Sequence, residues 1–252
     1  MACITEVYWD RGDYEVNQDS AVLEQVVLRH RAITMAAVAD GIGGLSEGEN
    51  VSGYAAGSLI RWFYTEGAYF MLRPGASHLL RRSLERLVYS MHCDIRKYAA
   101  VHGKGEMGTT CTLFLMTGKR YYCAHLGDSR CMHIRHGRGL AGVIQRTDAE
   151  WITKDDVAEN GALTRCIGSM GYFRPKWISG HLASGDRILL CSDGFCRKND
   201  SRKIAAALSS GGITSQTALE RSVRTIAQCA RSSGEKDNIT AICVVVGKRE
   251  DA

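Results

Sequence analysis

The sequence has few of the features that mark membrane-spanning, exported or multidomain proteins. It contains only two prolines among 252 residues, and no proline-rich or serine-rich linker divides it, so a single domain covering residues 1–252 is expected. No segment reaches the roughly 18 apolar residues of a membrane-spanning helix, and the N-terminal residues lack the pattern of a signal peptide. These absences predict a cytoplasmic protein with no membrane partner.

Concentrated charge is also lacking. Lysine and arginine number 32 against 27 aspartates and glutamates, which gives a formal net charge of +5, but the two signs are interspersed. A basic tail that binds nucleic acid is therefore not expected. The chain contains no Gly-x-x-x-x-Gly-Lys-Ser/Thr motif either, so a P-loop nucleotide site is not indicated.

Ten cysteines are present, but no two of them form a Cys-x-x-Cys pair. A zinc site built on such pairs is therefore disfavoured, and without an export signal the cysteines are expected to be buried free thiols. A cysteine-based phosphatase mechanism is disfavoured as well. Neither Cys191 nor Ser192 is paired with a histidine base, and no loop of backbone donors ending in arginine is recognised after Cys191.

Hydrophobic periodicity places strands at both ends of the chain. Strands are predicted over 3–9, 20–28, 32–39, 110–116, 121–126, 131–135, 177–182, 187–191 and 239–246. Helices are predicted over 47–64, 76–100, 202–208 and 214–230, with Ser46 capping the first. Because strands and helices come in blocks, the pattern indicates an α+β fold in which helices pack on largely antiparallel sheets.

Four aspartates share one local setting, in which each ends an apolar strand-like run and is followed by glycine, serine or asparagine. They are Asp40, Asp128, Asp193 and Asp237. A carboxylate at the end of a buried strand is costly to desolvate unless a cation meets it, and Mg²⁺ and Mn²⁺ prefer such oxygen ligands. Each aspartate taken singly is an ordinary turn residue. Together they predict a divalent metal site.

The sequence around these aspartates resembles that of a known family, the metal-dependent protein phosphatases of the PPM type, also called type 2C. The matching motifs, in chain order, are Asn17-Gln18-Asp19-Ser20, Ala39-Asp40-Gly41-Ile42-Gly43-Gly44, Gly108-Thr109-Thr110, Leu126-Gly127-Asp128-Ser129-Arg130, Leu163-Thr164-Arg165-Cys166-Ile167-Gly168, Leu190-Cys191-Ser192-Asp193-Gly194 and Asp237-Asn238-Ile239-Thr240. They cover nearly the whole chain and are closest to bacterial-type members. The resemblance implies an α/β/β/α four-layer sandwich, with two antiparallel sheets packed face to face and helices outside.

The resemblance also implies a centre of two Mn²⁺ or Mg²⁺ ions, with a third, weaker ion in bacterial-type members. The residues implied for the pair, which act in catalysis through it, are Asp40, the carbonyl of Gly41, Asp193 and Asp237. Asp128 and Asp193 would hold the third ion, and Asp19 would lie behind the ligands and orient metal-bound water. Two such ions activate a water or hydroxide for direct attack on phosphorus. The implied reaction is hydrolysis of phosphoserine and phosphothreonine in proteins.

Substrate contacts cannot be carried over in the same way. Tyr14 stands where many members have an arginine that grips the substrate phosphate, which leaves Arg11 as a nearby substitute on a different strand face. Ile42 stands where eukaryotic members have a histidine, so no catalytic histidine is expected. His125 and His133 are interpreted as structural or surface residues.

A segment that forms a flap beside the active site in relatives is short here. Residues 148–162 have room for one or two helix turns, and the charged residues within them are interpreted as a solvated face. Those residues are Lys154, Asp155, Asp156 and Glu159.

Two other functions remain open on the sequence. A pseudophosphatase that binds phosphoproteins with little turnover is consistent with Tyr14, although all four aspartates are retained. A hydrolase of small phosphoesters would use the same metal chemistry. The expected partners are phosphorylated protein substrates and a serine/threonine kinase or its targets, and a monomer is expected.

Overall fold

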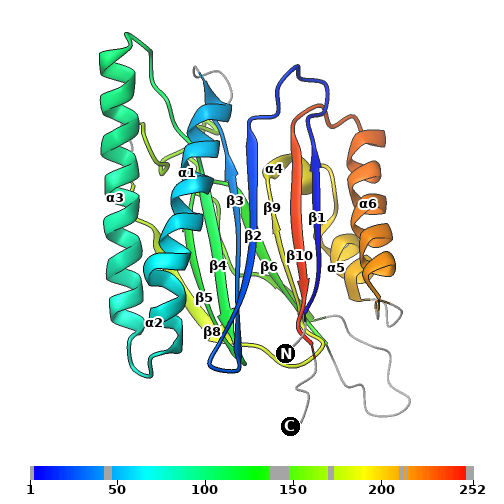
Figure 1. Cartoon of the computed structure of the whole chain (residues 1–252). Coiled ribbons are helices and arrows are strands. Elements are labelled where there is room, and N and C mark those ends of the chain that lie inside the picture. Colours follow the sequence, from blue (N-terminus) through cyan, green and yellow to red (C-terminus); the bar gives the residue numbers. More distant parts are fainter. Residues whose placement is uncertain are drawn as a thin grey trace, which may run out of the picture.

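Two five-stranded antiparallel sheets form the centre of the protein (Figure 1). The first has the order β1 (Ile4–Asp10), β10 (Ile239–Val245), β9 (Arg187–Cys191), β6 (Arg130–Arg135) and β7 (Asp148–Trp151). The second has the order β2 (Asp19–Leu28), β3 (Arg31–Asp40), β4 (Cys111–Thr117), β5 (Arg120–Leu126) and β8 (Lys176–His181). The computed structural model describes residues 3–42, 47–136, 148–169, 173–209, 213 and 215–247.

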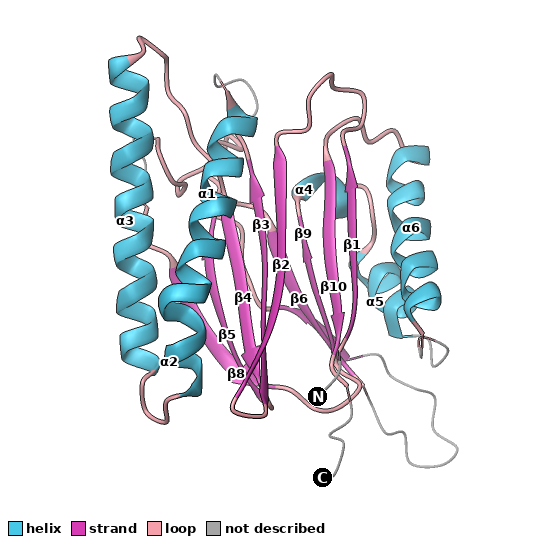
Figure 2. Ribbon diagram, viewed as in Figure 1, coloured by secondary structure: helices cyan, strands magenta, loops and turns pink. Residues whose placement is uncertain are grey.

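Helices cover the outer face of each sheet, as Figure 2 shows. The helices on the second sheet are α1 (Gly48–Trp62), α2 (Ala68–Leu72) and α3 (Ser77–Val101), with a π-helical turn at Phe63–Gly67 between the first two. Those on the first sheet are α5 (Ser201–Ser209) and α6 (Gln216–Ser232). The short α4 (Asp193–Cys196) precedes them and follows the end of β9. The α/β/β/α sandwich implied by the resemblance is therefore confirmed.

Three hydrophobic cores hold the four layers together, and β3 contributes to two of them. Ile33, Met35 and Ala37 face the helices α1 to α3, whereas Ala36 and Val38 face the other sheet, where Ile188, Leu190 and Ile242 lie. Side chains alternate between the faces of a strand, so a strand between two cores is apolar on both faces. The continuous apolar run of β3 follows from this position.

A two-residue turn at Arg29 and His30 joins β2 to β3. Both residues have left-handed backbone angles, φ 50° and 62°, which is the conformation that matches the twist of a tight hairpin. The turn sets a register in which every residue of β2 pairs directly with one of β3, ending with Asp19 opposite Asp40. The hairpin therefore brings two of the sequence-selected aspartates together.

The structure departs from the sequence predictions in several places. Ser46, expected to cap the first helix, lies outside the described residues. That helix was expected to end at 64 but continues through the π-helical turn to Leu72. Residues 148–162 begin with strand β7 in place of helix turns, because Ala149 and Trp151 pack against the first sheet's core. The ten cysteines are free as expected, but Cys93 and Cys229 are exposed.

The expected solvated face of residues 154–159 is wrong for its two aspartates. Asp156 is buried, accepts the N–H of Gly127, and pairs with Lys176 and with Arg165 at 3.4 Å. Asp155 pairs with Arg130 through two hydrogen bonds of 2.8 and 2.6 Å. Lys154 and Glu159 are exposed, as expected. The cationic partners lie far along the chain, so local composition does not reveal them.

The two histidines singled out in the sequence are buried structural residues. His133 contacts the carboxylate of Asp186 at 2.8 Å, and His125 contacts the hydroxyl of Thr112 at 2.9 Å. Neither lines the cavity described below. Within the described residues, no helix has the length and apolar character needed to cross a membrane.

Candidate metal centre

The four aspartates converge at one end of the sandwich, where the two sheets meet. Asp40 ends β3, Asp128 lies in the turn between β5 and β6, Asp193 follows β9, and Asp237 precedes β10. All four line one cavity of about 370 Å³. Strands from both sheets end here, so residues more than two hundred positions apart in the chain become neighbours.

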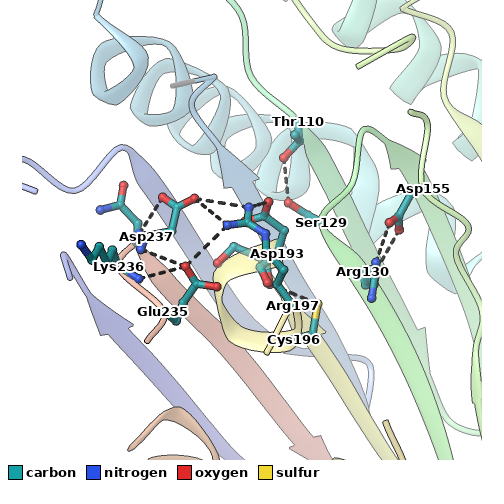
Figure 3. A network of polar contacts seen from close by, with 12 residues as sticks. Thr110, Ser129, Arg130, Asp155, Asp193, Cys196, Arg197, Glu235, Lys236 and Asp237 are labelled. Atoms are coloured by element: carbon teal, nitrogen blue, oxygen red, sulfur yellow. Dashed lines mark hydrogen bonds and ion pairs between the residues drawn. The ribbon is translucent and has the colours of Figure 1, made fainter. Parts of the chain in front are cut away.

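Two threonines of the Gly108-Thr109-Thr110 motif fix the backbone of Asp40. Its N–H donates to the Thr110 hydroxyl at 2.9 Å, and its carbonyl accepts from the Thr110 N–H at 2.8 Å and the Thr109 hydroxyl at 2.9 Å. The Thr110 hydroxyl also meets that of Ser129, beside Asp128, at 2.8 Å (Figure 3). The motif therefore links the positions of two cavity aspartates, a role that the sequence did not reveal.

The other side of the cavity is tied together through Asn238 and Ser192. Asn238 accepts the N–H of Gln18 at 2.8 Å and donates to the carbonyl of Arg11 at 2.7 Å, which fastens the loop before β2 to the start of β10. Ser192 exchanges hydrogen bonds with the backbone of Thr240, of 2.9 and 3.0 Å. Asp193 and Asp237 thus lie on neighbouring, hydrogen-bonded segments.

Glycines permit the close backbone approach on which the cavity depends. A Cβ atom on Gly41 would overlap the carbonyl of Gly48, and a Cβ on Gly194 would overlap the carbonyl of Asn238. The N–H of Gly41 donates to the carbonyl of Gln18 at 3.0 Å, which holds its peptide beside the cavity. A side chain at either glycine would push apart segments that carry the aspartates.

Replacing Gly194 by alanine is expected to lower the free energy of unfolding by about 1–3 kcal/mol, the usual cost of overpacking. Urea unfolding followed by circular dichroism measures it. Gly53 in α1 is the matched control, since a Cβ there meets open space and Gly53→Ala should stabilise by about 0.5–1 kcal/mol. Equal effects of the two substitutions would contradict the close packing of Gly194 against Asn238.

Burial and mutual repulsion raise the pKa values of the clustered carboxyl groups. Burial, followed by the charges of its carboxylate neighbours, raises the pKa of Asp40 well above its ordinary value. Burial and then Asp193 raise the pKa of Asp128 to about 6. Burial also raises the pKa of Asp193. Such a cluster is stable in its ionised form only when cations neutralise it.

Asp19 adds a second reason to expect a polar or cationic occupant. Neither of its buried carboxylate oxygens has a hydrogen-bond partner among the described residues. Burial raises its pKa to about 6, although the nearby hydroxyls of Thr240 and Ser192 oppose that rise without being aligned for a hydrogen bond. Buried oxygens without donors are rare in folded proteins. Water or a cation in the cavity would satisfy them.

The sequence profile of the protein phosphatase 2C family matches residues 11–242, a stretch that includes all the aspartates above. The chain belongs to the protein phosphatase 2C family. Its cavity aspartates are therefore the ones that the sequence motifs of the family had singled out.

Two curated protein phosphatases resemble this member of the protein phosphatase 2C family along most of its length. PstP, a serine/threonine protein phosphatase of Mycobacterium tuberculosis, is 26% identical over 252 residues, which covers 92% of this chain. PhpP, a protein phosphatase of Streptococcus pneumoniae, is 27% identical over 230 residues, covering 87% of this chain and 88% of PhpP. The chain spans only 43% of the length of PstP.

Solved structures of the protein phosphatase 2C fold match the sandwich closely. The catalytic domain of PstP, in complex with two manganese ions, is similar with a TM-score of 0.75 at 26% identity, covering 98% of this chain and 99% of that domain. Stp1 from Staphylococcus aureus has a TM-score of 0.80 at 21% identity, covering 98% and 96%. The likeness to Stp1 supports the fold alone.

The carboxylates suit hard divalent ions in chemistry, but not all of them point freely into the cavity. In the described part of the chain, no group of three or more histidine, cysteine, aspartate or glutamate side chains is arranged to hold a metal ion as it stands. The guanidinium of Arg197 contacts both Asp193 and Asp237. A metal ion at these two residues has to share their oxygens with Arg197.

Arg197 also corrects the sequence interpretation of Cys191. It is an arginine that follows Cys191 after five intervening residues, so the expected absence of such an arginine is wrong. A cysteine nucleophile is nevertheless ruled out at this position. Cys191 is fully buried in β9, and burial raises its pKa well above the ordinary value, which leaves the thiol protonated and out of reach.

The lining of the cavity includes an exposed aromatic residue. Tyr14 lines the cavity and is 56% exposed. Arg11, the candidate phosphate ligand from the sequence, donates to the carbonyl of Glu15 at 3.3 Å and is not among the residues that line the cavity. Of the described residues that line it, Arg197 is the only cation.

Proposed function

We propose that this chain is a metal-dependent protein phosphatase that hydrolyses phosphoserine and phosphothreonine. One observation carries the proposal: in a chain of the protein phosphatase 2C family, aspartates from four separate segments line a single cavity. The raised pKa values of Asp40 and Asp128, which reflect burial and carboxylate repulsion, support a cationic occupant. PstP is a serine/threonine protein phosphatase and PhpP is a protein phosphatase, and the likeness to both supports phosphorylated proteins as substrates.

The roles proposed for the residues follow from their positions. Asp40, Asp193 and Asp237, with the carbonyl of Gly41, would hold two Mn²⁺ or Mg²⁺ ions. When bound, such ions supply a nucleophilic oxygen at neutral pH and neutralise charge that develops on the phosphoryl group. Asp19, whose two carboxylate oxygens have no hydrogen-bond partner among the described residues, would accept hydrogen bonds from water and orient it. Thr109 and Thr110 fix the backbone of Asp40 and so set the position from which its side chain extends.

The test compares substrates and metals in one assay. We expect Mn²⁺ to support hydrolysis of a phosphothreonine peptide and of p-nitrophenyl phosphate, and a chelator to abolish both. A folded protein without turnover would indicate a pseudophosphatase. Clear preference for nucleotides over the phosphopeptide would indicate a hydrolase of small phosphoesters.

Phosphorylated proteins are the proposed partners, together with a serine/threonine kinase or its targets. A monomeric state and a cytoplasmic location belong to the same proposal. The protein substrates find support in the chain's likeness to PhpP, a protein phosphatase of which it covers 88%. Light scattering of the purified protein tests the monomer directly.

A further inference from the structure

The guanidinium of Arg197 lies inside the acidic cluster of the cavity. Figure 3 shows it between Asp193 on one side and Asp237 and Glu235 on the other. It forms an ion pair with Oδ2 of Asp193, and its Nη1 and Nη2 each lie 3.4 Å from Oδ2 of Asp237. Nη1 also lies 3.5 Å from Oε1 of Glu235. The single positive charge of Arg197 thus contacts the carboxylates of Asp193, Asp237 and Glu235.

The partners of Arg197 are themselves held in place. Glu235 is buried, and its Oε1 accepts the N–H groups of Lys236 and Asp237 at 3.0 and 3.1 Å. The backbone N–H of Arg197 donates to the carbonyl of Asp193 at 2.7 Å, one turn earlier in α4. Arginine stays charged at every physiological pH. Moving this cation away would leave the buried Glu235 without the ion-pair partner that it has in the described structure.

The position of this cation conflicts with a third metal ion. The sequence resemblance implies that Asp128 and Asp193 share that ion, while Asp193 also serves the metal pair. A carboxylate has two oxygens, so Asp193 would need one for the pair and the other for the third ion. Its Oδ2 is taken by Arg197. Arg197 and Asp128 line the same cavity.

We propose that the guanidinium of Arg197 takes the place of the third metal ion, so that this chain uses two divalent ions and one tethered cation. The inference rests on the proposed function, because it concerns the same centre. A planar guanidinium with five N–H donors can neutralise Asp193 and Asp237 from the side while leaving their other oxygens for metal ions. The third-ion role implied for Asp128 is therefore not available in the native chain.

Counting bound Mn²⁺ tests this without measuring turnover. Equilibrium dialysis of the full chain, followed by elemental analysis, should give two Mn²⁺ ions per chain for the native protein. Arg197→Met removes the charge and keeps an unbranched stem, and it should raise the count to three. Arg197→Met combined with Asp128→Asn should return it to two. Arg11→Met is the matched control and should leave the count at two, because the Arg11 side chain in the described structure donates its hydrogen bond to the backbone carbonyl of Glu15.

The native count keeps the test decisive even if Arg197→Met does not fold. Three ions in the native chain would overturn this inference and leave the proposed function intact. A count that stays at two in folded Arg197→Met would also overturn it, since the charge of Arg197 would then not be what excludes the third ion. No bound Mn²⁺ in the native chain would remove both the inference and the proposed function.

Discussion

Replacing Asp40 by asparagine is expected to lower Mn²⁺-dependent hydrolysis of a phosphothreonine peptide by about a thousandfold or more. Asp40 is proposed to hold the metal pair, and its loss would remove several kcal/mol of charge stabilisation in the transition state. About 4 kcal/mol corresponds to a thousandfold change in rate. The fold should survive, because Thr109 and Thr110 bind the backbone of Asp40 and not its side chain. Steady-state kinetics and thermal melting measure the two effects separately.

The melting temperature of metal-free Asp40→Asn should equal or exceed that of the native chain. Burial and neighbouring carboxylates raise the pKa of Asp40, so its ionised form is unfavourable without metal, and the neutral amide relieves that repulsion. Asp40 is a cleaner choice than Asp193, whose loss would also remove a partner of Arg197. Asp148→Asn is the matched control, since that side chain is 68% exposed on β7. Turnover like that of the native chain in Asp40→Asn would refute its role.

The stabilisation that Mn²⁺ confers should be larger near pH 7.5 than near pH 5. Burial, followed by neighbouring carboxylates, raises the pKa of Asp19 to about 6 from an ordinary value of 3.8. Between these values the folded protein binds more protons than the unfolded chain, so metal-free stability falls as pH rises through that window. This rise in the pKa of Asp19 corresponds to about 3 kcal/mol of folding free energy. Mn²⁺ offsets the cost where the carboxylates are ionised.

Differential scanning fluorimetry with and without Mn²⁺ at the two pH values measures this linkage. Asp19→Asn should flatten the pH dependence of the metal-free melting temperature, because the neutral amide has no proton to release. Asp13→Asn, at an exposed position in the loop after β1, should leave it unchanged. An equal Mn²⁺ shift at both pH values would show that the carboxyl groups do not control metal binding as described.

Much of the fold could be predicted because its strands carry strong periodic patterns. The run from Ala32 to Ala39 is apolar except for Thr34, and it forms a strand packed on both faces. The turn at Arg29 and His30 consists of two polar residues between two predicted strands, and it sets the pairing of Asp19 with Asp40. An aspartate at the end of a strand is visible in a sequence. Convergence of several such ends follows when the strands share an edge of the sandwich.

The ion pairs around the site could not be predicted, because most of them join residues far apart in the sequence. Asp156 looks like a surface residue until Lys176 and Arg165 are brought beside it. Arg197 follows Asp193 by one helical turn, a spacing that permits an ion pair, but α4 is too short for a periodic pattern to reveal it. Glu235 reaches Arg197 only because the pairing of β10 with β9 brings their ends together.

Asp40, Asp193 and Asp237 are proposed to hold a pair of divalent ions. Anomalous diffraction from crystals grown with Mn²⁺ tests this most directly, because the scattering locates manganese independently of the side-chain positions. We expect two anomalous peaks, both within coordination distance of a carboxylate oxygen of Asp40, and one of them also within that distance of Asp193 and Asp237. Strong peaks elsewhere in the crystal, with none at Asp40, would contradict it.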